Sequence, residues 1–95
     1  MNSASAVTDI DDNDVRVTTW TFDTAGAATG DHVHEYDYVV VPITGGRFTV
    51  VDSAGTTRDM TQEQALPYRG VAGTSHNVVS ATESRVVFVE IELKR

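Results

Sequence analysis

The chain has 95 residues, 40% of them hydrophobic, a size that fits one compact domain. It contains no cysteine, which excludes disulfides, thiolate zinc sites, iron–sulfur clusters and cysteine nucleophiles. Seven basic and fourteen acidic residues give a formal net charge of −7, which disfavours binding to nucleic acid or to an anionic membrane surface. No apolar run approaches the roughly 20 residues of a membrane helix. The start, MNSASAVTDIDDND, lacks the basic and apolar regions of a signal peptide, so we expect a cytoplasmic protein.

The first fourteen residues differ in composition from the rest of the chain. They include four aspartates, no basic residue and almost no bulky apolar residue. A segment of this kind buries too little apolar surface to offset the entropy lost on ordering. We therefore predict a disordered acidic tail over residues 1–14 and a single folded domain over residues 15–95.

From residue 15 onward, short stretches rich in β-branched and aromatic residues alternate with turn residues, a pattern that predicts strands. Residues 61–64, TQEQ, fit a helix capping box, but no helical period follows, so they allow one helical turn at most. Many short strands with closely spaced turns favour an all-β antiparallel sandwich or barrel. The expected strands cover residues 15–22, 36–43, 47–52, 56–60, 67–71, 75–80 and 85–93.

The last expected strand has two different faces. One face is wholly apolar, whereas the other begins with Val86 and Phe88 and ends with Glu90 and Glu92. This pattern predicts a sheet with one side on a core. We expect Glu90 and Glu92 to lie on a solvated face or at the rim of a dimer.

The chain has three histidines, His32, His34 and His76. The first two lie two positions apart in an extended stretch, so their imidazoles leave the same face, and His76 belongs to another strand. Three neutral imidazoles that converge form a site for zinc, iron, nickel, copper or manganese. Three protein ligands also leave coordination positions open, as in catalytic sites. The alternative is that these are ordinary polar residues of a sheet.

The histidines fall within a longer pattern of residues. Gly26, His32, His34 and Gly45 resemble the first sequence motif of the cupins, G-x5-H-x-H-x3-4-E-x6-G. The second cupin motif, G-x5-P-x-G-x2-H-x3-N, is matched by Gly73 and His76, whereas its first glycine, its proline and its asparagine are replaced by Ala65, Val71 and Ser80. Flanking glycines at the right offsets favour the metal-binding interpretation of the three histidines.

Two further runs, HEYDYVVVP at 34–42 and FVEIELK at 88–94, are similar to very small bacterial cupins of the RmlC-like superfamily. Some members of that group are named beta-alanine degradation proteins. The resemblance implies a cupin double-stranded β-helix, a jelly-roll barrel of antiparallel strands, with a metal held by His32, His34 and His76. It also implies association as a homodimer.

The glutamate of the first cupin motif is absent, because Tyr38 or Val39 stands in its position. Regular strand alternation puts Tyr38 on the face of the histidines, where its hydroxyl could donate a hydrogen bond to charge that develops in a reaction. We therefore name Tyr38 as the candidate catalytic residue. Asp37 faces away unless a bulge shifts the register, so Asp37 and Glu35 are weaker alternatives as ligands.

Two more residues are candidates for substrate binding. Tyr36 shares the face of the histidines, and Arg69 lies near the second motif, where its guanidinium could bind a substrate carboxylate. The alternatives are a barrel-lining aromatic for Tyr36 and a surface ion pair for Arg69. Asn77 points to the face opposite His76 and is expected to be structural.

Two functions of different classes fit these residues. In the first, the protein is a small enzyme that uses a divalent transition metal, iron, zinc, nickel or manganese, on a small organic acid or related metabolite. Oxygenase, isomerase and hydrolase reactions all occur on this fold, which does not choose among them. In the second, the site binds a metal or small ligand without turnover, as a sensor or accessory protein of a catabolic pathway. In either case we expect a small-molecule partner rather than nucleic acid or a membrane.

Overall fold

The computed structural model describes residues 2–95, and regular structure in that range consists of nine strands without an α-helix. The expectation of an all-β fold is therefore confirmed. No helix in the described range is long and apolar enough to cross a membrane. The strands are β1 (Ser5–Asp11), β2 (Val15–Phe22), β3 (His32–Val33), β4 (Asp37–Pro42), β5 (Gly46–Asp52), β6 (Thr57–Gln62), β7 (Tyr68–Gly70), β8 (Ser75–Ser80) and β9 (Val86–Leu93).

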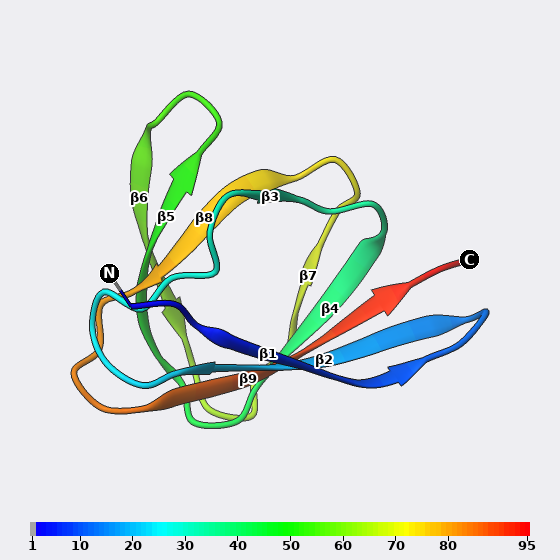
Figure 1. The fold of residues 1–95 in the computed structure, drawn as a ribbon, viewed down its shortest axis with the longest axis horizontal. Helices are drawn as coiled ribbons and strands as arrows, with labels where there is room; N and C mark the ends of the chain where they lie inside the picture. Colours follow the sequence, from blue (N-terminus) through cyan, green and yellow to red (C-terminus); the bar gives the residue numbers. More distant parts are fainter. Residues whose placement is uncertain (1) are drawn as a thin grey trace.

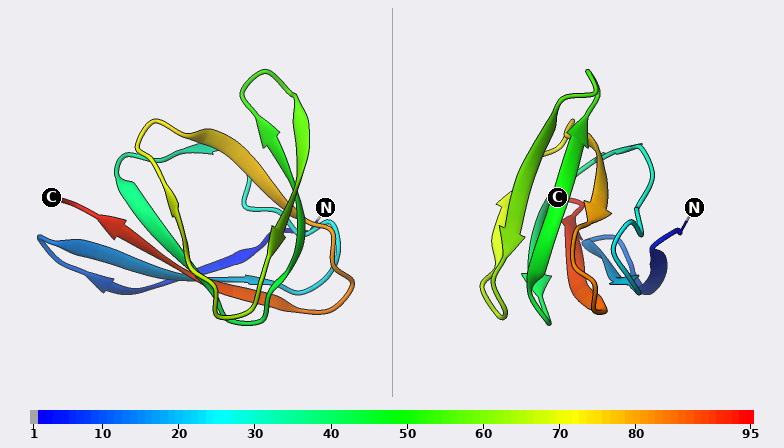
Figure 2. Two further views of the ribbon diagram at one scale, coloured as in Figure 1. Left: turned by 180° about the vertical axis from the view of Figure 1, so that it is seen from behind. Right: turned by 90° about the vertical axis from the view of Figure 1, so that its left-hand side faces the viewer.

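The strands form two sheets that enclose a common interior. One sheet has the order β1-β2-β9-β4-β7 and the other the order β3-β8-β5-β6, and every paired strand is antiparallel to its neighbour. In Figure 1, β1, β2 and β9 run along one side of the barrel and β3 and β8 along the opposite side. The β5–β6 hairpin closes one end of this view and β4 and β7 the other, which Figure 2 shows from behind and from the side.

The N-terminal segment differs from the prediction of a disordered tail. Residues 5–11 form β1, an edge strand that pairs with β2 from Ser5↔Thr21 to Asp11↔Arg16. All its side chains are exposed, so the strand is held by backbone hydrogen bonds to the edge of β2 rather than by apolar burial. Lys94 fixes the far end of the strand, because its ammonium binds both the Asp11 carboxylate and the carbonyl of Asp12.

The other sequence expectations differ in smaller ways. The seven strands expected from residue 15 onward are present, two with the expected boundaries and five with boundaries shifted by one or two residues, and the histidine segment adds β3. The capping-box segment forms no helical turn, since Thr61 and Gln62 complete β6. The motif glycines Gly26, Gly45 and Gly73 all have positive φ, between 77° and 89°, which turns of this kind require.

The interior changes from apolar to polar along two paired strands. On the inner face of β2 and β9, Phe22 lies opposite Val86, and at the other end Arg16 lies opposite Glu92. Phe22 is fully buried and packs with Phe48 and Phe88 at ring-centroid distances of 5.2 and 5.5 Å. One end of the barrel is therefore a packed aromatic core, and the opposite end holds charged and polar side chains.

Candidate metal centre

The three histidines meet at the polar end of the interior. His32 and His76 lie directly opposite one another in the β3–β8 pair. Val33, between the two N-terminal histidines, is 65% exposed, whereas His34 is buried, so His32 and His34 leave the same inward face. The structure thus confirms that the imidazoles of His32, His34 and His76 lie close together.

The spacing of the three imidazoles fits a single metal ion. The Nε2 atom of His34 lies 3.2 Å from that of His32 and 3.1 Å from that of His76. Ligand atoms that each lie about 2.1 Å from one ion stand roughly 3.0 to 3.4 Å apart in octahedral or tetrahedral geometry. The three nitrogens are thus spaced as ligands of one ion, and the structure itself contains no ion.

The orientation of His32 is fixed by its other ring nitrogen. Nδ1 lies 2.9 Å from the carbonyl oxygen of Gly30, an acceptor, so this nitrogen carries the proton and Nε2 is left with a free lone pair. The amide of Gly30 in turn donates to Oδ1 of Asn77 at 3.1 Å. Asn77 thus has the structural role expected from the sequence, and it acts on the loop that orients His32.

Burial keeps two of the imidazoles neutral. Desolvation, together with the neighbouring His32, lowers the pKa of His34 to about 4. Desolvation and the nearby His32, His34 and Arg58 lower the pKa of His76 to about 4 as well. Because only a neutral imidazole can bind a metal, both side chains are ready to do so at neutral pH.

Two carboxylates complete the polar end, contrary to the expectation for β9. Glu90 and Glu92 do not face solvent: their side chains are 12% and 7% exposed, and they point inward beside His34. The prediction of a solvated face was wrong because Val86 and Phe88, on the same face, pack into the core. The wholly apolar face of β9, formed by Val87, Val89, Ile91 and Leu93, is the outer one and is only half-buried.

The two carboxylates have different partners. Arg16 donates through Nε to one oxygen of Glu92 and through Nη2 to the other at 2.8 Å. Glu90 accepts a long hydrogen bond of 3.4 Å from Nε1 of Trp20, and its other oxygen lies 3.7 Å from Nε2 of His34. Burial, and then the negative charge of Glu92, raise the pKa of Glu90. Among residues 2–95, no lysine or arginine pairs with Glu90.

The chain is similar to known proteins both in sequence and in structure. The chain is 42% identical over 85 residues to the beta-alanine degradation protein BauB of Pseudomonas aeruginosa, covering 90% of this chain and 87% of that protein. It superimposes with a TM-score of 0.93 on the crystal structure of a cupin domain from Bordetella pertussis, with 36% identity and coverage of 99% and 96% of the two chains. The chain belongs to the cupins.

A more distant structure shows the fold alone. A cupin superfamily protein from Desulfitobacterium hafniense is 12% identical, with a TM-score of 0.74 over 99% of this chain and 80% of that one. No protein-family model matches the chain. Together with the two antiparallel sheets, these relatives confirm the expected cupin double-stranded β-helix.

In this cupin Tyr38, one of the two residues at the possible glutamate positions of the first motif, places an aromatic ring beside the histidines. Tyr38 is buried, and its ring stacks on that of His34 at a centroid distance of 3.9 Å. Its cross-strand partner is Gly70, where a β-carbon would overlap the phenol ring. Burial, followed by the charge of Glu90, raises the pKa of Tyr38, so the phenol remains protonated.

The weaker candidates for the missing carboxylate lie away from the imidazoles. Asp37 is exposed and accepts a hydrogen bond of 2.9 Å from the amide of Ala72. Glu35 is 71% exposed and lies 4.0 Å from Arg16. Neither is grouped with the three histidines, whereas Glu90 and Glu92, on β9, are grouped with His34. The sequence reasoning missed both, because the contact of Glu92 with Arg16 depends on the pairing of β2 with β9, two strands far apart in the chain.

A cavity of about 440 Å³ lies beside His76. Its lining includes the buried Tyr38, the half-buried His76 and the exposed Arg58 and Arg69, without a carboxylate. The structure thus brings Arg69 and Tyr38 to one space beside the histidines. Tyr36 does not line this cavity: the guanidinium carbon of Arg16 lies 5.9 Å from the centre of its ring.

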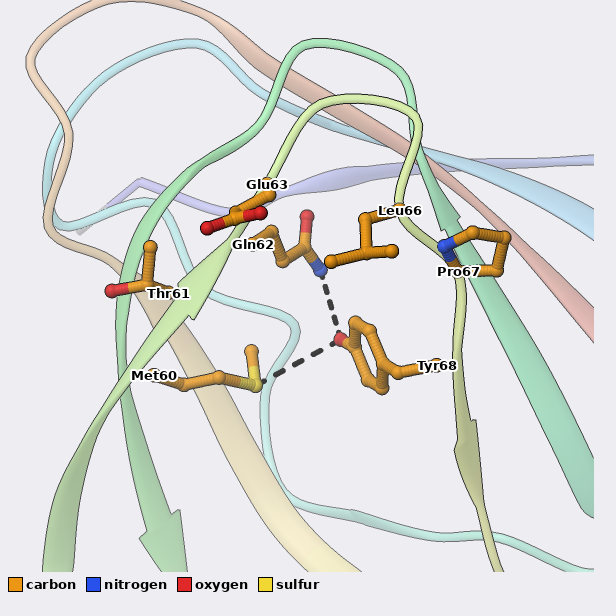
Figure 3. A pocket seen from close by; sticks show the side chains of 7 residues that line it. All are labelled: Met60, Thr61, Gln62, Glu63, Leu66, Pro67 and Tyr68. Carbon is orange, nitrogen blue, oxygen red and sulfur yellow. Dashed lines mark hydrogen bonds between the residues drawn. The ribbon is translucent and has the colours of Figure 1, made fainter.

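A smaller pocket of about 320 Å³ adjoins this cavity between β6 and β7. Figure 3 shows Met60, Gln62 and Tyr68 pointing toward one another there. The amide of Gln62 donates to the hydroxyl of Tyr68 at 2.9 Å. Because Met60 and Tyr68 line both spaces, this contact fixes the wall between the pocket and the arginine-lined cavity.

Proposed function

We propose that this cupin binds a divalent transition metal through His32, His34 and His76 and acts on a small organic acid as a metal-dependent enzyme. The observation that carries the proposal is the convergence of three imidazoles next to a cavity with two arginines. The Nε2 atom of His34 lies 3.2 Å from that of His32 and 3.1 Å from that of His76. Iron, zinc, nickel and manganese are all compatible with imidazole ligands, and Arg58 and Arg69 favour an anionic substrate.

The cavity suits a small carboxylate in size and charge. Its volume of about 440 Å³ falls in the range of small-molecule sites. The chain as a whole has a net charge of −7. The lining of this cavity is positively charged instead, because it contains two arginines and no carboxylate. A guanidinium can bind a carboxylate through two parallel hydrogen bonds. Arg58 and Arg69 would thus orient an acid toward His76.

A metal ion and the side chains around it would contribute different parts of the reaction. A bound divalent ion would polarise a substrate oxygen as a Lewis acid, or support oxygen chemistry if it is iron. Tyr38 lines the same cavity with a protonated phenol, which can donate a hydrogen bond to an oxygen that gains charge. The name of the relative from Pseudomonas aeruginosa, a beta-alanine degradation protein, supports a small amino or organic acid as substrate.

Metal analysis and substrate turnover test this proposal. Protein made without an affinity tag should contain close to one transition metal ion per chain, and His76→Ala should lose it. The loaded protein is then assayed with C3 and C4 carboxylic acids, with oxygen consumption as one readout. Arg69→Ala should raise KM, whereas Arg47→Ala, an exposed arginine outside the cavity, should not.

The same experiment separates catalysis from binding alone. Calorimetric binding of an acid without turnover under any metal would support the alternative of a non-catalytic sensor or accessory protein of a catabolic pathway. A wild-type protein that takes up no transition metal would contradict the metal-dependent enzyme and a metal sensor, and would leave only an accessory protein that binds a small ligand without metal.

We also propose a homodimer, supported by the outer face of the five-stranded sheet. Ile91 lies there between Val17 and Val39, and Val89 lies next to Val41. These side chains are only half-buried, although they form one continuous apolar surface. Light scattering after gel filtration should give twice the chain mass, and Ile91→Lys should give the mass of one chain.

A further inference from the structure

We propose that Glu90, on β9, is a carboxylate ligand of the ion held by His32, His34 and His76. This inference deepens the proposed function and rests on it. It assigns the carboxylate that the first cupin motif lacks at position 38 or 39 to a strand at the other end of the sequence. The three histidines come from the β3–β8 side of the barrel, and Glu90 comes from the opposite sheet.

The distances support a shared ion. Glu90 Oε1 lies 3.7 Å from Nε2 of His34, the imidazole that stands in contact with both of the others. Two ligand atoms about 2.1 Å from one ion can be separated by at most about 4.2 Å, when they lie on opposite sides of it. His34 belongs both to the cluster with His32 and His76 and to a second cluster with Glu90 and Glu92. A change in the rotamer of Glu90, without a change in the path of β9, would bring its oxygen to an ion at the three imidazoles.

The hydrogen-bond and ion-pair partners of the two glutamates show which carboxylate is available to bind a metal ion. Both oxygens of Glu92 accept hydrogen bonds from Arg16, so its charge is already compensated. Glu90 has no such cation in the described range, although its side chain is only 12% exposed. A buried carboxylate without a cation is costly, and a divalent ion at the imidazoles would supply the missing positive charge.

Trp20 sets the direction of the Glu90 carboxylate. Its indole N–H donates to Oε2 of Glu90 at 3.4 Å, which leaves Oε1 toward His34. The same indole lies parallel to the ring of His32, at a centroid distance of 6.5 Å and an interplanar angle of 20°. One side chain thus borders both a histidine ligand and the carboxylate, and these groups line one cavity of about 290 Å³ with Arg16.

The test uses cobalt(II), whose visible absorption depends on its ligands. The probe is titrated into the full-length metal-free protein, with affinity measured by competition against a chelator. Wild type should bind one ion, and His76→Ala should abolish binding. Glu90→Gln should weaken binding on the order of tenfold to a hundredfold and change the spectrum, since it removes a charged ligand at nearly constant shape.

Two further variants make the result specific. Glu83→Gln removes the same charge from an exposed position outside the site and should leave affinity and spectrum unchanged. Glu90→Asp keeps the charge but withdraws the oxygen by one methylene, so it should also weaken binding if the oxygen touches the ion. The melting temperature of each metal-free variant establishes that it folds, and Glu90→Gln should melt at or above the wild-type temperature because it removes a buried uncompensated charge.

The outcomes for Glu90 and for the histidine site are separable. If Glu90→Gln binds cobalt(II) with wild-type affinity and spectrum while His76→Ala does not bind, Glu90 is not a ligand and the proposed function stands. If Glu90→Asp binds like wild type, Glu90 acts through its charge and the assignment as a ligand is overturned. If wild-type protein binds no cobalt(II), both the proposed histidine site and the proposed role of Glu90 are wrong.

Discussion

The ring of Tyr38 lies over Gly70, its partner in the β4–β7 pair, and a β-carbon at position 70 would overlap the phenol. The same ring stacks on that of His34 at 3.9 Å between centroids. Gly70 therefore provides the space that allows an aromatic side chain to stand beside the histidines, where the cupin motif carries a glutamate.

Gly70→Ala should force Tyr38 out of this position. We expect a loss of about 1 to 3 kcal/mol in the free energy of unfolding, the usual cost of an overpacked interior. Urea unfolding of the metal-free protein measures it. The control is the same change in a Tyr38→Ala background, where the added methyl group has room; an equal loss in both backgrounds would show that the clash is not the cause.

Asn77→Ala should weaken metal binding although Asn77 binds no metal. It removes the acceptor for the Gly30 amide, and the carbonyl of Gly30 orients His32. Losing such an outer partner lowers metal affinity on the order of tenfold. Chelator competition measures the effect, and Asn77→Asp, which keeps an acceptor oxygen at this position, should retain more of the affinity than alanine does.

Arg16→Met should destabilise the protein by leaving Glu92 buried without its cation. The Glu92 side chain is 7% exposed and Arg16 is 31% exposed, so partial solvation of the arginine limits the loss to about 2 kcal/mol. Thermal and urea unfolding would detect it. A second change, Glu92→Gln, should restore most of the lost stability in the Arg16→Met background, and a failure to do so would mean that Arg16 acts mainly by packing.

The metal-free protein should become less stable as the pH falls from about 6.5 toward 4. The folded state holds the pKa of His34 and His76 at about 4, whereas unfolded imidazoles have a pKa near 6.5. In this window the unfolded chain binds more protons, so acid favours unfolding. His34 alone should account for on the order of 2 kcal/mol at pH 5.

Urea unfolding at pH 7, 6 and 5 in the presence of a chelator measures this dependence. His76→Asn removes one of the two groups and should reduce the slope. A free energy of unfolding that stays level between pH 7 and pH 5 would contradict the burial of neutral imidazoles.

The sequence predicted the histidine centre because strand alternation and motif spacing are local properties. His32 and His34 share a face in any extended segment, and the glycines of the two motifs sit at turns with positive φ. The register that places His32 opposite His76 is set by the pairing of β3 with β8, which strand alternation alone does not predict.

The two errors concern properties that neighbouring strands decide. The segment 5–11 has little to bury, yet it is ordered as β1 because the edge of β2 offers it backbone partners. The inward face of β9 is the one that begins with Val86 and Phe88, because Phe22 and Phe48 pack against it. The acids that follow on that face are thereby carried inside, and local composition gave no indication of this.

The placement of the proposed ligands on opposite sheets has a consequence for the life of the protein in the cell. An ion bound to His32, His76 and Glu90 would tie the two halves of the barrel together in a chain that has no cysteine for a covalent staple. Loss of that ion would then lower the free energy of unfolding and raise the fraction of unfolded chain that proteases can cleave, so that metal supply would affect the lifetime of this protein as well as its activity.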